Sequence, residues 1–120
     1  MTRFTILARV AFWAALIGAV TMAVLPHPPH TPLDQYGDKV EHIFAFAVIS
    51  ACAAAAFPRF PLYRIGERLS FVGALIEVVQ SIPDLHRDCD IRDWVADTCA
   101  VIVVLLIAGL FRRLRKPSAT

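Results

Sequence analysis

Four apolar stretches dominate this sequence and leave few folds open to it. They cover residues 10–25, 40–57, 69–82 and 94–111, and proline, glycine or charged residues bound each of them. A helix needs about 17–25 residues of this kind to cross a hydrocarbon core about 30 Å thick. The second and fourth stretches have this length, and the first reaches it when extended back to Phe4. The third reaches it if its helix begins near Tyr63 and Arg64 and Arg68 extend their charges to the interface.

The composition favours lipid over water as the solvent of these stretches. Hydrophobic residues make up 58% of the 120 residues and charged residues 18%, against about 45–50% and about 25% in soluble domains. A soluble domain of this size keeps much of its surface in water and could not bury so many apolar side chains. We therefore predict one all-α domain over residues 1–120, a four-helix transmembrane bundle with helices at about 4–25, 40–57, 63–82 and 92–111.

Two of the four segments have a second interpretation. The first resembles a signal peptide, with Arg3 and Arg9 before an apolar run, but no clear A-x-A cleavage site follows it, and we favour an uncleaved anchor. The third has only 14 residues from Leu69 to Ile82 and could be a buried helix of a soluble protein. Because its three neighbours have membrane length, we interpret it as a span.

The basic residues predict the orientation of the bundle. Nine of the twelve lie at the amino end, in the second loop or in the tail: Arg3, Arg9, Arg59, Arg64, Arg68, Arg112, Arg113, Arg115 and Lys116. Loops rich in Lys and Arg stay in the cytoplasm, so both termini are predicted to be cytoplasmic, in the inner membrane of a bacterium. Of the ten acidic residues, all but Glu67 fall on the opposite side. The net charge of +2 indicates no nucleic-acid partner.

The predicted outer end gathers polar residues from the last three segments. Asp38 and His42 are four residues apart and share a helix face, with Lys39 between them. Glu77 and Gln80 are three apart within the third segment. A carboxyl group inside a span usually faces a bundle interior or a wet cavity. The alternative for all of these residues is a polar network that only holds helices together.

The loop and the fourth segment add further candidates to this end. Asp90, Asp93 and Asp97 form one acidic stripe that enters the membrane, and Arg87 could bind a carboxylate or phosphate through two hydrogen bonds. A metal held by His42, Glu77 and Asp97 is conceivable, but no metal-ligand spacing supports it, and we expect neither a metal nor another cofactor. The first segment is expected to bring no polar residue to the cluster and to act mainly as an anchor.

These residues resemble the pattern of the VanZ-like family. That family is recognised by Asp-Lys-x-x-His, then Glu-x-x-Gln, then an Arg and a downstream Asp before a last helix with Asn and Gly. The matching residues here are Asp38, Lys39, His42, Glu77, Gln80, Arg87 and Asp93. The similarity covers Asp38 to about Ala100, but Asp97 and Ala100 replace the Asn and Gly. The resemblance implies a membrane protein related to ones linked to low-level teicoplanin resistance, and it implies no substrate.

Three functions remain open at this point. In the first, the outer end binds or acts on an anionic amphiphile, such as a lipid-linked cell-envelope component. His42, Glu77 and Asp93 are then the catalytic candidates, and Asp38, Lys39, Gln80, Arg87 and Asp97 the ligand-binding ones. In the second, the chain is a non-catalytic interaction or structural module that contacts membrane lipids and an unknown protein partner. The third, transport, is weaker, because the inner halves of the segments lack ionisable residues for a path.

Overall fold

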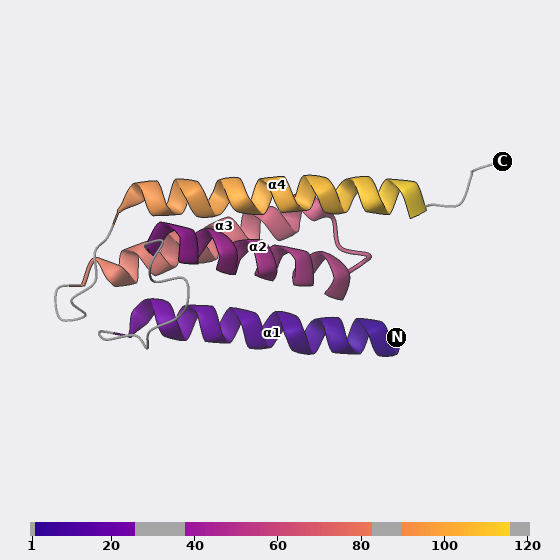
Figure 1. Cartoon of the computed structure of the whole chain (residues 1–120), viewed down its shortest axis with the longest axis horizontal. Coiled ribbons are helices and arrows are strands. Elements are labelled where there is room, and N and C mark those ends of the chain that lie inside the picture. Colours follow the sequence, from indigo (N-terminus) through magenta and orange to yellow (C-terminus); the bar gives the residue numbers. More distant parts are fainter. Residues whose placement is uncertain (1, 26–37, 83–89, 116–120) are drawn as a thin grey trace.

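The computed structural model describes residues 2–25, 38–82 and 90–115, and all of its regular structure is helical. The four helices are α1 (Arg3–Val24), α2 (Asp38–Ala56), α3 (Leu62–Gln80) and α4 (Ile91–Arg115), which lie side by side along one long axis (Figure 1). The predicted helical fold and the order of its helices are confirmed. Most helix ends fall within two residues of the prediction, but α4 continues four residues further, to Arg115.

Local signals account for the helix ends. The Thr2 side chain accepts a hydrogen bond from the Thr5 amide at 3.1 Å and thereby caps the start of α1. Pro58 lies two residues after the end of α2, and Pro61 directly precedes α3, as expected for a residue that cannot continue a helix. The Asp90 side chain accepts from the Arg92 amide at 2.9 Å at the start of α4. Three arginines lie in the last turn of α4, where their positive charges interact favourably with the negative end of the helix dipole.

Three of the described helices are long and apolar enough to cross a membrane. These are α1, the Lys39–Ala56 part of α2, and α4. The third helix, for which the sequence also predicted a span, does not meet the same requirement. Its 19 residues include four charged ones: Arg64, Glu67, Arg68 and Glu77. The structure thus supports a membrane protein with three candidate spans and one more polar helix packed beside them.

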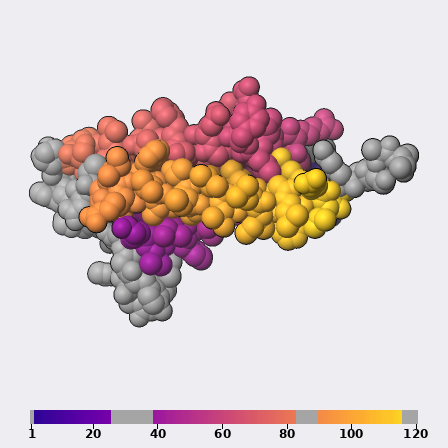
Figure 2. All heavy atoms as spheres, turned by 90° about the horizontal axis from the view of Figure 1, so that it is seen from above, coloured from indigo at the N-terminus to yellow at the C-terminus, as the bar shows by residue number. Residues whose placement is uncertain are grey.

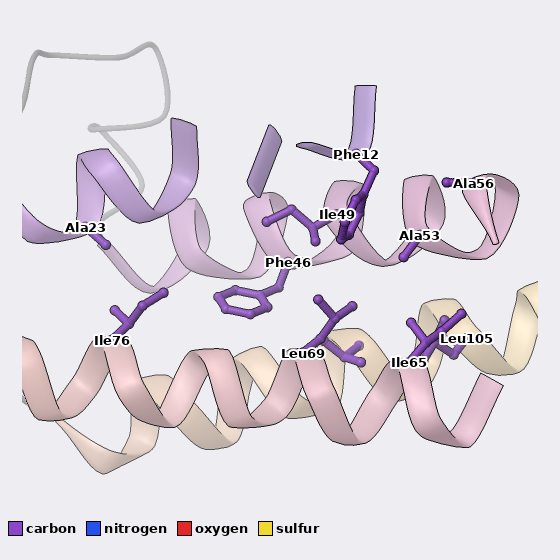
Figure 3. Packing of buried hydrophobic residues seen from close by; sticks show 11 residues of the cluster. Phe12, Ala23, Phe46, Ile49, Ala53, Ala56, Ile65, Leu69, Ile76 and Leu105 are labelled. Atoms are coloured by element: carbon purple, nitrogen blue, oxygen red, sulfur yellow. The ribbon is translucent and has the colours of Figure 1, made fainter. Parts of the chain in front are cut away.

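The core lies between the helices, and their outer faces are apolar as well. Phe46 and Ile49 of α2, Leu69 and Ile76 of α3, and Val101 of α4 are buried against one another, part of the cluster drawn in Figure 3. α2 packs on both α1 and α4, and α3 packs on α4. Seen from above, α4 runs along the molecule beside α3 (Figure 2). All four helices also expose large apolar side chains, which suits a surface that faces lipid.

Because neighbouring helices in the chain are antiparallel, the bundle has two distinct ends. We call the end where α2 and α4 begin and α1 and α3 finish the acidic end, since it holds Glu77, Asp93 and Asp97. The opposite end, where α2 and α4 finish, is the basic end, since it holds Arg9 and Arg112.

At the basic end, two arginines complete the carboxyl end of α2. Arg112 donates hydrogen bonds to the carbonyls of Ala54, Phe57 and Phe60 at 3.0, 3.0 and 2.8 Å. The Nε group of Arg9 donates to the Ala56 carbonyl at 2.9 Å. The last carbonyls of a helix have no partner within the helix, so α1 and α4 supply donors for α2.

Candidate functional site

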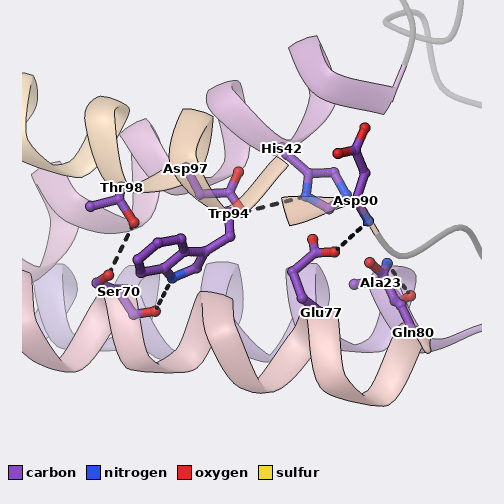
Figure 4. Close-up of polar contacts among 9 residues, drawn as sticks. All are labelled: Ala23, His42, Ser70, Glu77, Gln80, Asp90, Trp94, Asp97 and Thr98. Carbon is purple, nitrogen blue, oxygen red and sulfur yellow. Dashed lines mark hydrogen bonds and ion pairs between the residues drawn. The ribbon is translucent and has the colours of Figure 1, made fainter. Parts of the chain in front are cut away.

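His42, Glu77 and Asp97 converge at the acidic end from three different helices. His42 lies in the second turn of α2, Glu77 one turn before the end of α3, and Asp97 in the second turn of α4. One nitrogen or oxygen atom of each lies within 4.8 Å of the other two. The His42 Nδ1 and Asp97 Oδ2 atoms are 3.5 Å apart, and Figure 4 shows this contact. The structure therefore brings together three residues that are 35 and 20 positions apart in the sequence.

The polar side chains of this cluster are almost entirely withdrawn from solvent. Asp97 is 1% exposed, Gln80 2% and Glu77 6%. The buried atoms without a hydrogen-bond partner in the described structure are Glu77 Oε1, Gln80 Oε1 and both carboxylate oxygens of Asp97. Burying a polar atom without a partner costs about 1–3 kcal/mol, and more when the group is charged. Of these four oxygens, Asp97 Oδ2 still faces His42 Nδ1 at 3.5 Å. The other three are acceptors available to water, a proton or a ligand.

The other polar atoms of Glu77 and Gln80 connect this cluster to its surroundings. Glu77 Oε2 accepts a hydrogen bond from the Asp90 amide at 3.1 Å, which ties α3 to the residue before α4. Gln80 Nε2 donates to the Ala23 carbonyl at 2.9 Å, in the last turn of α1. The first helix thus contributes a backbone carbonyl to the cluster, which the expectation about its polar residues did not address. No sequence signal marks such a carbonyl, since every residue carries one.

Below this cluster lies a polar layer in which each donor has a partner. Trp94 Nε1 donates to the Ser70 carbonyl at 3.0 Å, and the Ser70 and Thr98 hydroxyls are 3.0 Å apart (Figure 4). Sequence reasoning missed these residues. Their signal is the spacing Ser70–Gly73–Glu77 on α3 and Trp94–Asp97–Thr98 on α4, which places each set on one face.

A close approach at Gly73 forms the floor of the site. A Cβ atom built on Gly73 would lie 3.4 Å from the Trp94 ring and 3.5 Å from the Phe46 ring. The two rings therefore pack directly against the α3 backbone, one turn below Glu77. A side chain larger than a methyl group at this position would have to displace them.

The remaining predicted site residues surround this cluster or lie outside the described residues. Asp93 is half-buried in the first turn of α4, close enough to His42 and Glu77 to interact electrostatically. Lys39 is exposed. Asp38 is the first residue of α2, but its side chain is not described, and Arg87 lies outside the described residues.

Asp90 closes the cluster on the side of the loop. The backbone N–H of Arg92 donates to its carboxylate, and this hydrogen bond lowers the pKa of Asp90 below its ordinary value, with a smaller contribution from the Arg92 side chain. Asp90 is thus held ionised by Arg92, while its own amide is committed to Glu77. The Asp90 amide thus holds the Glu77 side chain in place through one hydrogen bond.

A pocket of about 570 Å³ lies at the basic end, far from these residues. It is lined by Thr2, Thr5, Arg9, Phe57, Pro58, Arg59 and Phe60. The lining holds no acid and no histidine, and Arg9 Nε already donates to Ala56. This pocket therefore offers no acid–base or metal-ligating group, whereas His42, Glu77 and Asp97 at the acidic end do.

Comparisons of this chain with protein-family models, with curated proteins and with solved structures find no match. The function is therefore inferred from the geometry and chemistry of the acidic end.

Proposed function

We propose that this chain is a multi-pass protein of the bacterial inner membrane whose acidic end binds the head group of an amphiphile at the outer leaflet. The three apolar helices supply the membrane anchor, and the positive-inside rule supports cytoplasmic termini. In this proposal α3 is the fourth span. Its beginning carries Arg64, Glu67 and Arg68, all exposed at the basic end, where long side chains can extend to the interface.

The observation that carries the proposal is the set of buried oxygens without partners. A network selected only for helix packing is expected to satisfy its members, since partial satisfaction is worse than an apolar core. The Ser70–Trp94–Thr98 layer meets that expectation. Glu77 and Asp97 do not, although both are buried. The contrast favours a binding role over the alternative of a structural or interaction module.

The surroundings of the site suit an amphiphile rather than a free solute. Large apolar side chains next to the site on all three contributing helices are exposed, among them Val40, Phe44, Val78 and Val95. Glu77 lies about 4.5 Å along α3 from the helix end, by the rise of about 1.5 Å per residue. A head group could therefore enter between the helix ends while its hydrocarbon chains stay along the apolar flanks.

The resemblance to the VanZ-like family adds a substrate class to this proposal. It favours a lipid-linked cell-envelope component, whose diphosphate would meet the exposed Lys39. Arg87, which lies outside the described residues, is proposed from the sequence as a second cation for the same group. His42 and Glu77 are then the residues placed to exchange protons with the ligand, and Asp93 the residue placed to orient His42. The site is proposed to bind the head group, and catalysis by His42 and Glu77 would require that binding first.

Ligand binding by the purified protein tests the proposal. In lipid nanodiscs, native mass spectrometry should detect a bound polyprenyl diphosphate in preference to phosphatidylglycerol. Glu77→Gln and Arg87→Lys should each weaken that binding by at least about tenfold, which corresponds to about 1.4 kcal/mol. Glu67→Gln changes the exposed glutamate of the same helix and is the matched control, expected to bind as the unaltered protein does. Equal binding by all four proteins would contradict the proposal.

A cellular measurement separates binding from a purely structural role. Glu77→Gln and Arg87→Lys should abolish any glycopeptide tolerance that the protein confers while leaving its abundance in the membrane unchanged. If the polar cluster only holds helices together, both variants should lose abundance instead. Full tolerance and full abundance in both variants would overturn both roles.

A further inference from the structure

The acidic end concentrates negative charge, and no lysine or arginine side chain among the described residues is buried beside it. Glu77 and Asp97 are buried, and their ligand atoms lie within 4.8 Å of each other and of His42. Among the described residues, Lys39 and Arg92 are the lysine and arginine nearest in sequence to the site, and both are exposed. Arg92 is paired with Asp90 at 3.3 Å. Two ionised carboxylates this close and this buried repel strongly unless a positive charge lies between them.

We propose that His42, Glu77 and Asp97 bind a divalent transition-metal ion. The 3.5 Å between His42 Nδ1 and Asp97 Oδ2 is close to the about 3.4 Å that separates two ligands on a tetrahedral ion with bonds of about 2.1 Å. Because the three ligand atoms lie within 4.8 Å of one another, Glu77 needs to approach by at most about 1.4 Å to reach the about 3.4 Å separation, which a side-chain rotation provides. The unpartnered Glu77 Oε1 and Asp97 oxygens are the atoms available to the ion.

The ligand types select the class of metal. One imidazole with two carboxylates suits Zn²⁺, Mn²⁺, Fe²⁺ or Co²⁺, whereas Mg²⁺ and Ca²⁺ prefer all-oxygen sites. Zinc sites with three protein ligands keep a fourth position for water or a substrate atom. The Asp90 amide, which donates to Glu77 Oε2, would hold that carboxylate while Oε1 faces the ion. An open position of this kind would also let an acidic site receive the anionic head group proposed above.

This site departs from the sequence-based expectation of no metal for a clear reason. Metal motifs are recognised by ligands at short, fixed spacings. Here each ligand comes from a different helix, and only the packing of α2, α3 and α4 brings them together (Figure 4).

Zinc binding by the full-length protein tests the proposal. The protein is purified in detergent with a tag that contains no histidine, stripped with a chelator, incubated with Zn²⁺ alone, desalted and analysed for bound metal. About one zinc ion per chain should be retained. Asp97→Asn and His42→Ala should each lower the zinc affinity by at least about 100-fold, since losing even an outer-shell partner lowers metal affinity by about 10–100-fold. Glu67→Gln, outside the site, should retain zinc.

Two further measurements protect the test against misleading results. His27 and His30 could hold zinc adventitiously, so the double variant His27→Ala/His30→Ala is measured as well and should retain it. Zn²⁺ should raise the melting temperature of the unaltered protein but not that of Asp97→Asn, which shows whether a folded variant has lost the site. Retention of no zinc by the unaltered protein, equal retention by Asp97→Asn, or loss in the double variant would each overturn the proposal. Since no lipid is used, metal binding can fail while head-group binding stands, and the reverse.

Discussion

The two ends of this bundle differ in whether their buried and half-buried polar groups have hydrogen-bond partners. At the basic end, Arg9 and Arg112 donate to the carbonyls of Ala54, Ala56, Phe57 and Phe60. At the acidic end, Glu77, Gln80 and Asp97 have four buried oxygens without a hydrogen bond, and His42 contacts one of the Asp97 oxygens at 3.5 Å. The first arrangement completes α2 within the chain itself, whereas the second is incomplete until something else is bound.

This difference indicates that the polar groups of the basic end stabilise the fold, whereas those of the acidic end serve a function. Unsatisfied buried groups lower stability, and proteins retain them chiefly where a function requires them. Removing Arg112 at the basic end should therefore lower the stability of the protein, whereas removing the charge of Glu77 at the acidic end should raise it.

The two ends should lie on opposite sides of the membrane, an all-or-none effect. In a chain with Cys52, Cys89 and Cys99 replaced by serine, a single cysteine at His30 should react with a membrane-impermeant maleimide in intact cells. A single cysteine at Ser118 should react only after the cells are lysed, because the basic tail keeps that end in the cytoplasm. Labelling of both positions in intact cells, or of neither, would contradict the proposed orientation.

Arg112→Met should destabilise the protein by about 3 kcal/mol. Methionine keeps much of the apolar stem but removes donors to three carbonyls, and hydrogen bonds that involve a charged group contribute about 1.5–3 kcal/mol each, not additively. Reversible unfolding in detergent measures the free-energy change. Arg113→Met, which removes an exposed charge one residue away, is the control and should stay within about 0.5 kcal/mol of the unaltered protein. Equal effects of the two substitutions would contradict the role of Arg112 in capping the end of α2.

Glu77→Gln should have the opposite effect to Arg112→Met and stabilise the metal-free protein by about 1.5 kcal/mol. Glutamine keeps an oxygen for the Asp90 amide and adds an amide donor for Asp97, while it removes one of two buried negative charges. Unfolding is measured in the presence of a chelator, with Glu67→Gln as the exposed control on the same helix. A loss of stability in Glu77→Gln alone would mean that Glu77 serves packing, and the contrast between the two ends would fail.

Much of the fold follows from the sequence, because apolar length and helix-ending residues are local properties. Pro58 and Pro61 mark the turn between α2 and α3, and the arginines of the last turn explain why α4 extends past Phe111. The number of spans is less directly readable. Arg64 and Arg68 reduce the apolar character of α3, so its place in the membrane depends on how those side chains reach the interface.

The candidate site was predictable only in part, since its residues meet through packing. The sequence placed His42, Glu77 and Asp97 near one end of the bundle, and the structure brings them within 4.8 Å. It could not predict that Gln80 would bond to the Ala23 carbonyl of α1, or that Trp94 would reach Ser70. Those contacts depend on the rotation of each helix about its axis, which hydrophobic periodicity leaves nearly undetermined when a helix is apolar on all sides.

Trp94→Phe tests two polar layers of the acidic end against each other and should have the smallest effect. It should lower the free energy of unfolding by about 1 kcal/mol. Phenylalanine can keep most of the packing against Gly73 but cannot donate to the Ser70 carbonyl, and one hydrogen bond contributes about 1 kcal/mol. Trp13→Phe is the control, because Trp13 lies on the exposed face of α1. If Trp94→Phe lowers stability while Glu77→Gln raises it, then hydrogen-bonded and unsatisfied polar groups lie in two adjacent layers of the acidic end. The hydrogen-bonded groups of Ser70, Trp94 and Thr98 would then support Glu77, which lies about two turns from Ser70 along α3. If Trp94→Phe changes nothing, that layer does not brace the site, and His42, Glu77 and Asp97 must be held in place by apolar packing alone.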